Sequence, residues 1–128
     1  MPHLSYDHAP GLAQLADMDA FADHMRRAMI DTGVFPLGGI RVRGHAASSQ
    51  SVADAAPDWL WLDMQLRIGQ GRSADDRNRA ADQLYAAARA FLEPCLGGRP
   101  FALSFELREI DPQFSRKGWN TIHTALKG

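Results

Sequence analysis

The chain has 128 residues, of which 45% are hydrophobic and 23% are charged, a composition typical of a globular protein and not of a disordered one. A net charge of −1 excludes a strong overall attraction to nucleic acid or acidic membranes, and the single cysteine, Cys95, excludes an internal disulfide and a cysteine-based zinc site. No basic segment followed by an apolar run opens the chain, and no apolar run reaches about 18 residues. We therefore predict a cytoplasmic protein with one domain over residues 1–128 and no contact with a membrane or nucleic acid.

The first segments predict a strand followed by a helix. The strand runs over Pro2–Asp7, because apolar and polar side chains alternate from the second residue onward. Apolar residues at three- and four-residue spacing then predict an amphipathic helix from about Leu12 to Asp31. Asp17 or Asp19 is its candidate N-cap, and Gly33 is its stop signal.

A Gly-Gly pair introduces the second predicted strand, Ile40 to about Ala47, in which Arg41 and Arg43 share one face. The small and polar residues that follow, up to Pro57, predict a loop. Within it we expect one short helical turn at Ser51–Ala55.

The second half repeats the order strand, helix, strand. Strict alternation predicts a strand over residues 59–68, with Trp59 and Trp61 on the face opposite the leucines. A short capping box at Ser73 starts a helix that we expect to end near Pro94, and a last strand covers Phe101–Ile110. The tail from residue 111 onward has partial helical spacing, so we expect it to be ordered.

This order predicts an α+β fold built from two β-α-β units, about residues 1–57 and 58–128, each with a right-handed parallel crossover. The two units would form a four-stranded mixed sheet with two helices on one face and the tail as an extra element. The other sheet face would be uncovered and would carry the tryptophans, which predicts self-association.

The topology brings several groups toward one edge of the sheet. Parallel crossovers place Pro2 and Arg41 together at the starts of their strands. If the two halves pack antiparallel, Arg72 and the start of the helix at Ser73 reach the same edge. Arginines and a helix N-terminus favour carboxylates or phosphates. The alternative is that Arg41 and Arg43 are ordinary surface residues and that the stretch around Arg72 is only a connector. The five histidines have no metal-ligand spacing, so no metal is expected.

Several stretches resemble one known family, the 5-carboxymethyl-2-hydroxymuconate isomerases of the tautomerase superfamily. The resemblance covers nearly the whole chain without a large insertion, although Ser5 and His8-Ala9-Pro10 depart from the family pattern. It is carried by these stretches: Met1-Pro2-His3, Gly33 to Arg43, Arg67 to Ser73, Ala102 to Glu106, and Asn120 to His123.

The resemblance implies a homotrimer and a cofactor-independent isomerase that moves a proton within a carboxylated dienol. It implies that Met1 is removed and that Pro2 becomes the catalytic base. It also implies that Arg41 and Arg72 bind substrate carboxylates and that Arg43, in the same stretch as Arg41, is a further substrate-binding residue. A terminal amine suits this role because nearby arginines and partial burial lower its pKa, so that it is neutral near pH 7.

The sequence leaves two other functions open. One is a tautomerase that acts on a different enol, such as a phenylpyruvate-like substrate. The other is a trimeric binding protein on the same scaffold without catalytic activity, which would fit a protein that keeps Met1.

Overall fold

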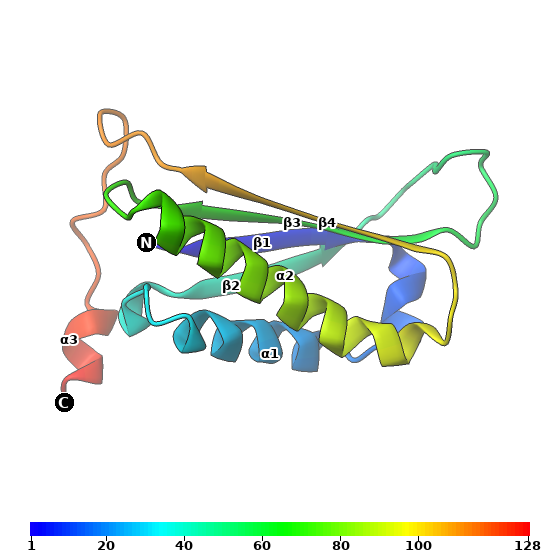
Figure 1. The fold of residues 1–128 in the computed structure, drawn as a ribbon, viewed down its shortest axis with the longest axis horizontal. Coiled ribbons are helices and arrows are strands. Elements are labelled where there is room, and N and C mark those ends of the chain that lie inside the picture. The colour runs from blue at the N-terminus through cyan, green and yellow to red at the C-terminus, as the bar shows by residue number, and fades with distance from the viewer.

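In the computed structural model, which describes residues 1–128, two helices pack on one face of a four-stranded sheet (Figure 1). The strands and helices have the following bounds: β1 His3–His8, α1 Met18–Asp31, β2 Arg41–Ala46, β3 Leu60–Ile68, α2 Ala74–Leu96, β4 Phe101–Glu109 and α3 Ile122–Leu126. Two short 3-10 helices, η1 (Pro10–Gln14) and η2 (Leu37–Gly39), precede α1 and β2. The predicted α+β fold with a mixed sheet and a C-terminal element is confirmed.

The sheet has the strand order β2-β1-β3-β4. β1 is parallel to β2, β3 is parallel to β4, and the two central strands β1 and β3 are antiparallel. Each parallel pair is joined through one helix, so each half of the chain is a β-α-β unit. The antiparallel register places His3 opposite Arg67, which brings the start of β1 next to the end of β3.

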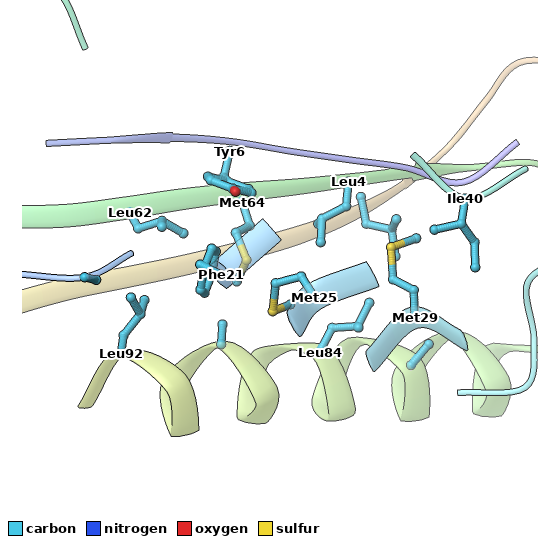
Figure 2. Close-up of a cluster of buried hydrophobic side chains, with 14 of the residues drawn as sticks. Leu4, Tyr6, Phe21, Met25, Met29, Ile40, Leu62, Met64, Leu84 and Leu92 are labelled. Carbon is cyan, nitrogen blue, oxygen red and sulfur yellow. The ribbon is translucent and has the colours of Figure 1, made fainter. Parts of the chain in front are cut away.

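The core lies between the sheet and the two helices (Figure 2). Alternate residues of β1 and β3 point into it, and Phe21, Met25 and Met29 of α1 meet them from below. The side chains that are almost fully buried include Leu4, Phe21, Met25, Met29, Leu62, Met64, Leu66 and Leu84. Because one residue of slippage in a strand would turn this apolar set toward solvent, the core fixes the register on which the site depends.

Two predicted helix boundaries differ from the structure. The segment from Leu12 first forms η1, and α1 begins only at Met18, because Asp17 caps a new helix by accepting a hydrogen bond from the Ala20 amide at 3.1 Å. In the second half of the chain, α2 passes through Pro94 and ends at Leu96, with Gly97 as its C-cap at a left-handed φ of 58°. Pro94 lies in the last turn, and Leu96 beyond it is buried, so packing outweighs the hydrogen bond that proline cannot make.

The loop between β2 and β3, residues 47–59, contains no helical turn at Ser51–Ala55, so that prediction was wrong. Ala53 and Ala55 have positive φ angles, which break a helix. The Asp54 carboxylate accepts a hydrogen bond from Trp59 Nε1 at 2.7 Å. Trp61 Nε1 donates to Gln50 Oε1 at 2.8 Å, so both tryptophans hold this loop.

The outer face of the sheet is polar. It carries His3, Ser5 and Asp7 of β1 with the polar partners that stand beside them in register on the neighbouring strands. No helix of the protein has the length and apolar character needed to cross a bilayer. The predictions of a single domain and of a cytoplasmic location stay predictions.

Candidate active site at the N-terminus

The N-terminus lies at the end of the sheet where β1 and β2 begin and β3 and β4 end (Figure 1). Pro2 is almost fully buried, and its carbonyl oxygen accepts a hydrogen bond from the Arg41 amide at 3.0 Å. The Pro2 ring packs against Gly39, where an added Cβ would lie 3.0 Å from Pro2 Cδ. A side chain at position 39 would therefore push against Pro2, so Gly39 sets the position of the proline.

Arg41 lies beside His3 on the outer side of the sheet. Its Nη1 donates to the carbonyl oxygens of Gly38 and Ile40, both at 3.0 Å. These bonds hold the half-buried side chain close to the backbone at the start of β2. The remaining donors of the guanidinium make no hydrogen bond within the chain.

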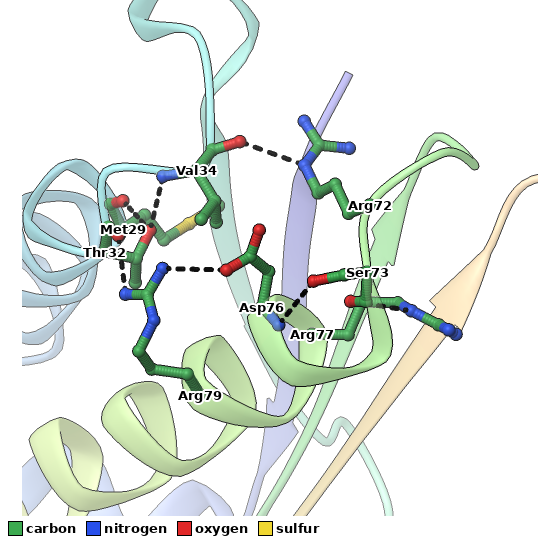
Figure 3. Close-up of polar contacts among 8 residues, drawn as sticks. All are labelled: Met29, Thr32, Val34, Arg72, Ser73, Asp76, Arg77 and Arg79. Carbon is green, nitrogen blue, oxygen red and sulfur yellow. Dashed lines mark hydrogen bonds and ion pairs between the residues drawn. The ribbon is translucent and has the colours of Figure 1, made fainter.

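Arg72 connects the two halves of the chain (Figure 3). Its Nε donates to the Val34 carbonyl at 2.9 Å, its Nη1 donates to the Gly69 carbonyl at 3.2 Å, and its guanidinium carbon lies 5.2 Å from the centre of the Phe35 ring. Two hydrogen bonds and a cation–π contact fix the orientation of this arginine and leave its Nη2 available.

The loop that Arg72 contacts is itself fixed to α2 (Figure 3). Arg79 donates to the Thr32 carbonyl at 2.9 Å, and the Thr32 hydroxyl donates to the Met29 carbonyl at 2.7 Å. Ser73 caps α2 by accepting a hydrogen bond from the Asp76 amide at 3.1 Å, as the capping box predicted. Arg72 therefore enters the site from a rigid strand-to-helix connection.

Arg43 is placed differently from the other two arginines. It is exposed on the outer sheet face, and its Nη1 lies 3.3 Å from His3 Nδ1. Unlike Arg41 and Arg72, it is not among the cations that lower the pKa of the Met1 amine. The structure thus brings Pro2, Arg41 and Arg72 to one end of the sheet and leaves Arg43 at its side.

A hollow of about 570 Å³ opens beside the N-terminus. Its walls come from the start of β1, the ends of β3 and β4, and the tail. Basic residues dominate among its lining side chains: His3, Arg67, Arg108, Arg116 and Lys117. No group of three His, Cys, Asp or Glu side chains is placed to hold a metal ion.

The charges around the hollow act on the terminal amine. Burial lowers the pKa of the Met1 α-amine below its ordinary value of 8.0, and the positive charge of Lys117 lowers it further. Three arginines add to this effect, namely Arg72, Arg67 and Arg41. Burial and the same surroundings also lower the pKa of His3. An amine at this position is therefore shifted toward its neutral, basic form.

The tail reaches back to the N-terminus, which the sequence pattern did not reveal. Asn120 Nδ2 lies 3.3 Å from Met1 Sδ and 3.2 Å from the Gly38 carbonyl oxygen. His123 of α3 packs on Gly38, which leaves no room for a Cβ there.

The sequence contained a signal that could have placed Arg67 and Arg108 in the site, since both belong to the polar faces of predicted strands. Nothing in the spacing pointed to Lys117.

The comparisons with known proteins agree with one another. The model of the family "5-carboxymethyl-2-hydroxymuconate isomerase" matches residues 2–126. A 5-carboxymethyl-2-hydroxymuconate Delta-isomerase from Escherichia coli is 32% identical over 127 residues, 99% of this chain and 100% of the relative. A solved 5-carboxymethyl-2-hydroxymuconate delta-isomerase superposes with a TM-score of 0.89 at 28% identity, over 98% of this chain and 93% of the other.

A more distant solved structure, a fused 4-OT symmetric trimer, matches with a TM-score of 0.67 at 17% identity, over 88% of this chain and 91% of the other. At that identity the likeness concerns the fold alone.

Proposed function

Because the chain belongs to the 5-carboxymethyl-2-hydroxymuconate isomerase family, we propose that it isomerises 5-carboxymethyl-2-hydroxymuconate, with Pro2 as the general base once Met1 has been removed. The observation that carries this proposal is the convergence of the buried Pro2 with Arg41, Arg72 and a basic hollow at one end of the sheet. The name of the substrate describes its chemistry, which is a dienol with three carboxylates.

Removal of Met1 would turn the Pro2 nitrogen from an amide, which has no basic lone pair, into a secondary amine. Met1 now covers this nitrogen and contacts Asn120, so its removal would also open space at the proline. The causes that lower the pKa of the Met1 amine, burial and nearby cations, would act on a prolyl amine one residue along. Such an amine is available as a base near neutral pH.

In the proposed reaction the neutral prolyl nitrogen takes a proton from the dienol and returns it to a different carbon, so that no atom is gained or lost. Negative charge develops on the conjugated system between the two steps. Arg41 and Arg72 would hold carboxylates of the substrate and stabilise this charge, because each keeps guanidinium donors that the protein does not use. The reaction as proposed requires no metal or organic cofactor.

Arg43 was assigned to the substrate by sequence, and we keep a weaker role for it. Its contact with His3 suggests that it adds positive charge at the edge of the site rather than a direct bond to the substrate.

We further propose that the protein is a homotrimer. The fused 4-OT symmetric trimer among the structures of this fold supports an assembly of three subunits.

The test starts from protein purified from its native host. Its intact mass reports whether Met1 is present, and the conversion of 5-carboxymethyl-2-hydroxymuconate is followed by ultraviolet absorbance. Pro2→Ala should lower kcat by about 100-fold or more, the range that positioned acid–base groups contribute. Pro57→Ala, in the exposed loop at the other end of the molecule, is the matched control and should leave kcat unchanged. Equal rates for Pro2→Ala and wild type would refute the mechanism, and a native protein that keeps Met1 would favour a binding function.

A further inference from the structure

Four basic residues stand side by side across all four strands of the sheet. Arg41 of β2 pairs in register with His3 of β1, His3 pairs with Arg67 of β3, and Arg67 pairs with Arg108 of β4. Neighbouring residues in register point to the same face, so three arginines and the His3 imidazole form one basic row on the outer face. Three members of this basic row, His3, Arg67 and Arg108, line the hollow beside the N-terminus.

Most of the cations around the hollow already have partners in the chain. Arg41 donates to two carbonyls, Arg108 donates to Glu106 at 2.7 Å, and Arg116 donates to carbonyl oxygens of Gln113 and Ser115 at 3.2 and 3.1 Å. The two acids that line the hollow are also engaged. Glu109 pairs with Arg77 at 3.1 Å, and Asp111 accepts a hydrogen bond from the Gln113 amide at 2.9 Å.

Arg67 and Lys117 are the exceptions, because neither makes an ion pair or side-chain hydrogen bond in the structure. Both line the hollow, and Lys117 also lines a smaller hollow of about 170 Å³ beside Gly69. Lys117 Nζ lies 3.9 Å from the position a Cβ on Gly69 would take, directly over the end of β3. Unpaired like charges repel, so a site that gathers them is stabilised when an anion binds between them.

From this geometry we propose that Arg67 and Lys117 form a second anion subsite that binds the carboxylate of the carboxymethyl arm. This inference rests on the proposed function, in which the substrate has three carboxylates. Arg41 and Arg72 account for carboxylates close to Pro2, and the third requires cations that are not committed elsewhere. The two residues come from β3 and from the tail, so the tail contributes directly to substrate choice.

The subsite can be tested without catalysis. Tricarballylate, with three carboxylates, and glutarate, with two, are titrated by calorimetry into protein whose N-terminal mass has been checked. We expect wild type to bind tricarballylate about tenfold or more tightly than glutarate, since one added charge-assisted contact contributes roughly that factor. Arg67→Gln and Lys117→Met should each remove most of this preference. The controls Arg27→Gln and Lys127→Met make the same charge changes outside the hollow and should keep it. A preference that survives in both subsite variants overturns the proposal.

A kinetic comparison separates this inference from the proposed function. The KM for 5-carboxymethyl-2-hydroxymuconate should rise about tenfold in each subsite variant, whereas the KM for 2-hydroxymuconate, which lacks the arm, should stay within about twofold. An equal rise for both substrates would contradict a subsite for the arm. If wild type isomerises neither dienol while the variants still lose the tricarballylate preference, the proposed function fails and the anion subsite stands.

Discussion

Arg72 offers the sharpest test of the site, because it both fastens a loop and lies close enough to the N-terminal amine to lower its pKa. In Arg72→Lys the side chain keeps its charge but loses the planar fork that reaches the Val34 and Gly69 carbonyls. Loss of one or both of these hydrogen bonds should lower the free energy of unfolding by about 1–2 kcal/mol. Loss of the charge-assisted contact between the free Nη2 and a substrate carboxylate should lower kcat/KM by about 100-fold, because each tenfold corresponds to about 1.4 kcal/mol.

Arg79→Lys is the matched control. Arg79 holds the same loop through the Thr32 carbonyl at 2.9 Å, but it is not among the cations that lower the pKa of the N-terminal amine. We expect a similar loss of stability, measured by urea unfolding, with kcat/KM within about threefold of wild type. If Arg72→Lys kept wild-type kcat/KM, Arg72 would have no role in the substrate complex. If both variants lost activity equally, the effect would come from the loop alone.

Two further predictions concern packing and protonation. Gly44→Ala would place a methyl group inside the buried Tyr6 ring, so we expect the free energy of unfolding to fall by about 2–3 kcal/mol and Tm to fall by several degrees. Gly118→Ala, which faces open space, is the control and should leave Tm unchanged. Equal Tm values for the two variants would contradict this account of the packing. In protein that retains Met1, the acylation rate of the Met1 α-amine should rise with pH and level off above a midpoint below pH 8.0, because only the neutral amine reacts. Lys117→Met should move that midpoint upward, since the variant removes a positive charge that lowers the pKa of the amine. An unchanged midpoint would show that Lys117 does not act on the amine.

The sequence predicted the fold well, because each strand alternates clearly and each helix has a strong apolar stripe. The antiparallel pairing of the two halves was expected only as one possibility, yet the position of the site depends on it. The pairing of His3 with Arg67 brings Gly69 and Arg72 to the N-terminus as anticipated. Pro2, Arg41 and Arg72 could therefore be placed together from topology alone.

The parts that escaped prediction depend on contacts between residues far apart in the chain. The approach of Asn120 and Lys117 to the N-terminus is set by how the tail folds over the end of β3, and no periodicity encodes that path. Sequence also treated the two tryptophans as a reason for self-association. In the structure both indoles donate to side chains of the loop 47–59, because the nearest partners for these polar groups lie within the same chain.

That loop has a practical consequence for anyone who labels or immobilises the protein. It projects from the end of the molecule opposite the N-terminus (Figure 1), and most of its residues are exposed. A peptide tag fused to the N-terminus would acylate the very nitrogen on which the proposed chemistry depends. A fluorophore or short affinity sequence inserted near Ser49 would leave that amine and its surroundings untouched, because exposed loop tips tolerate insertions best.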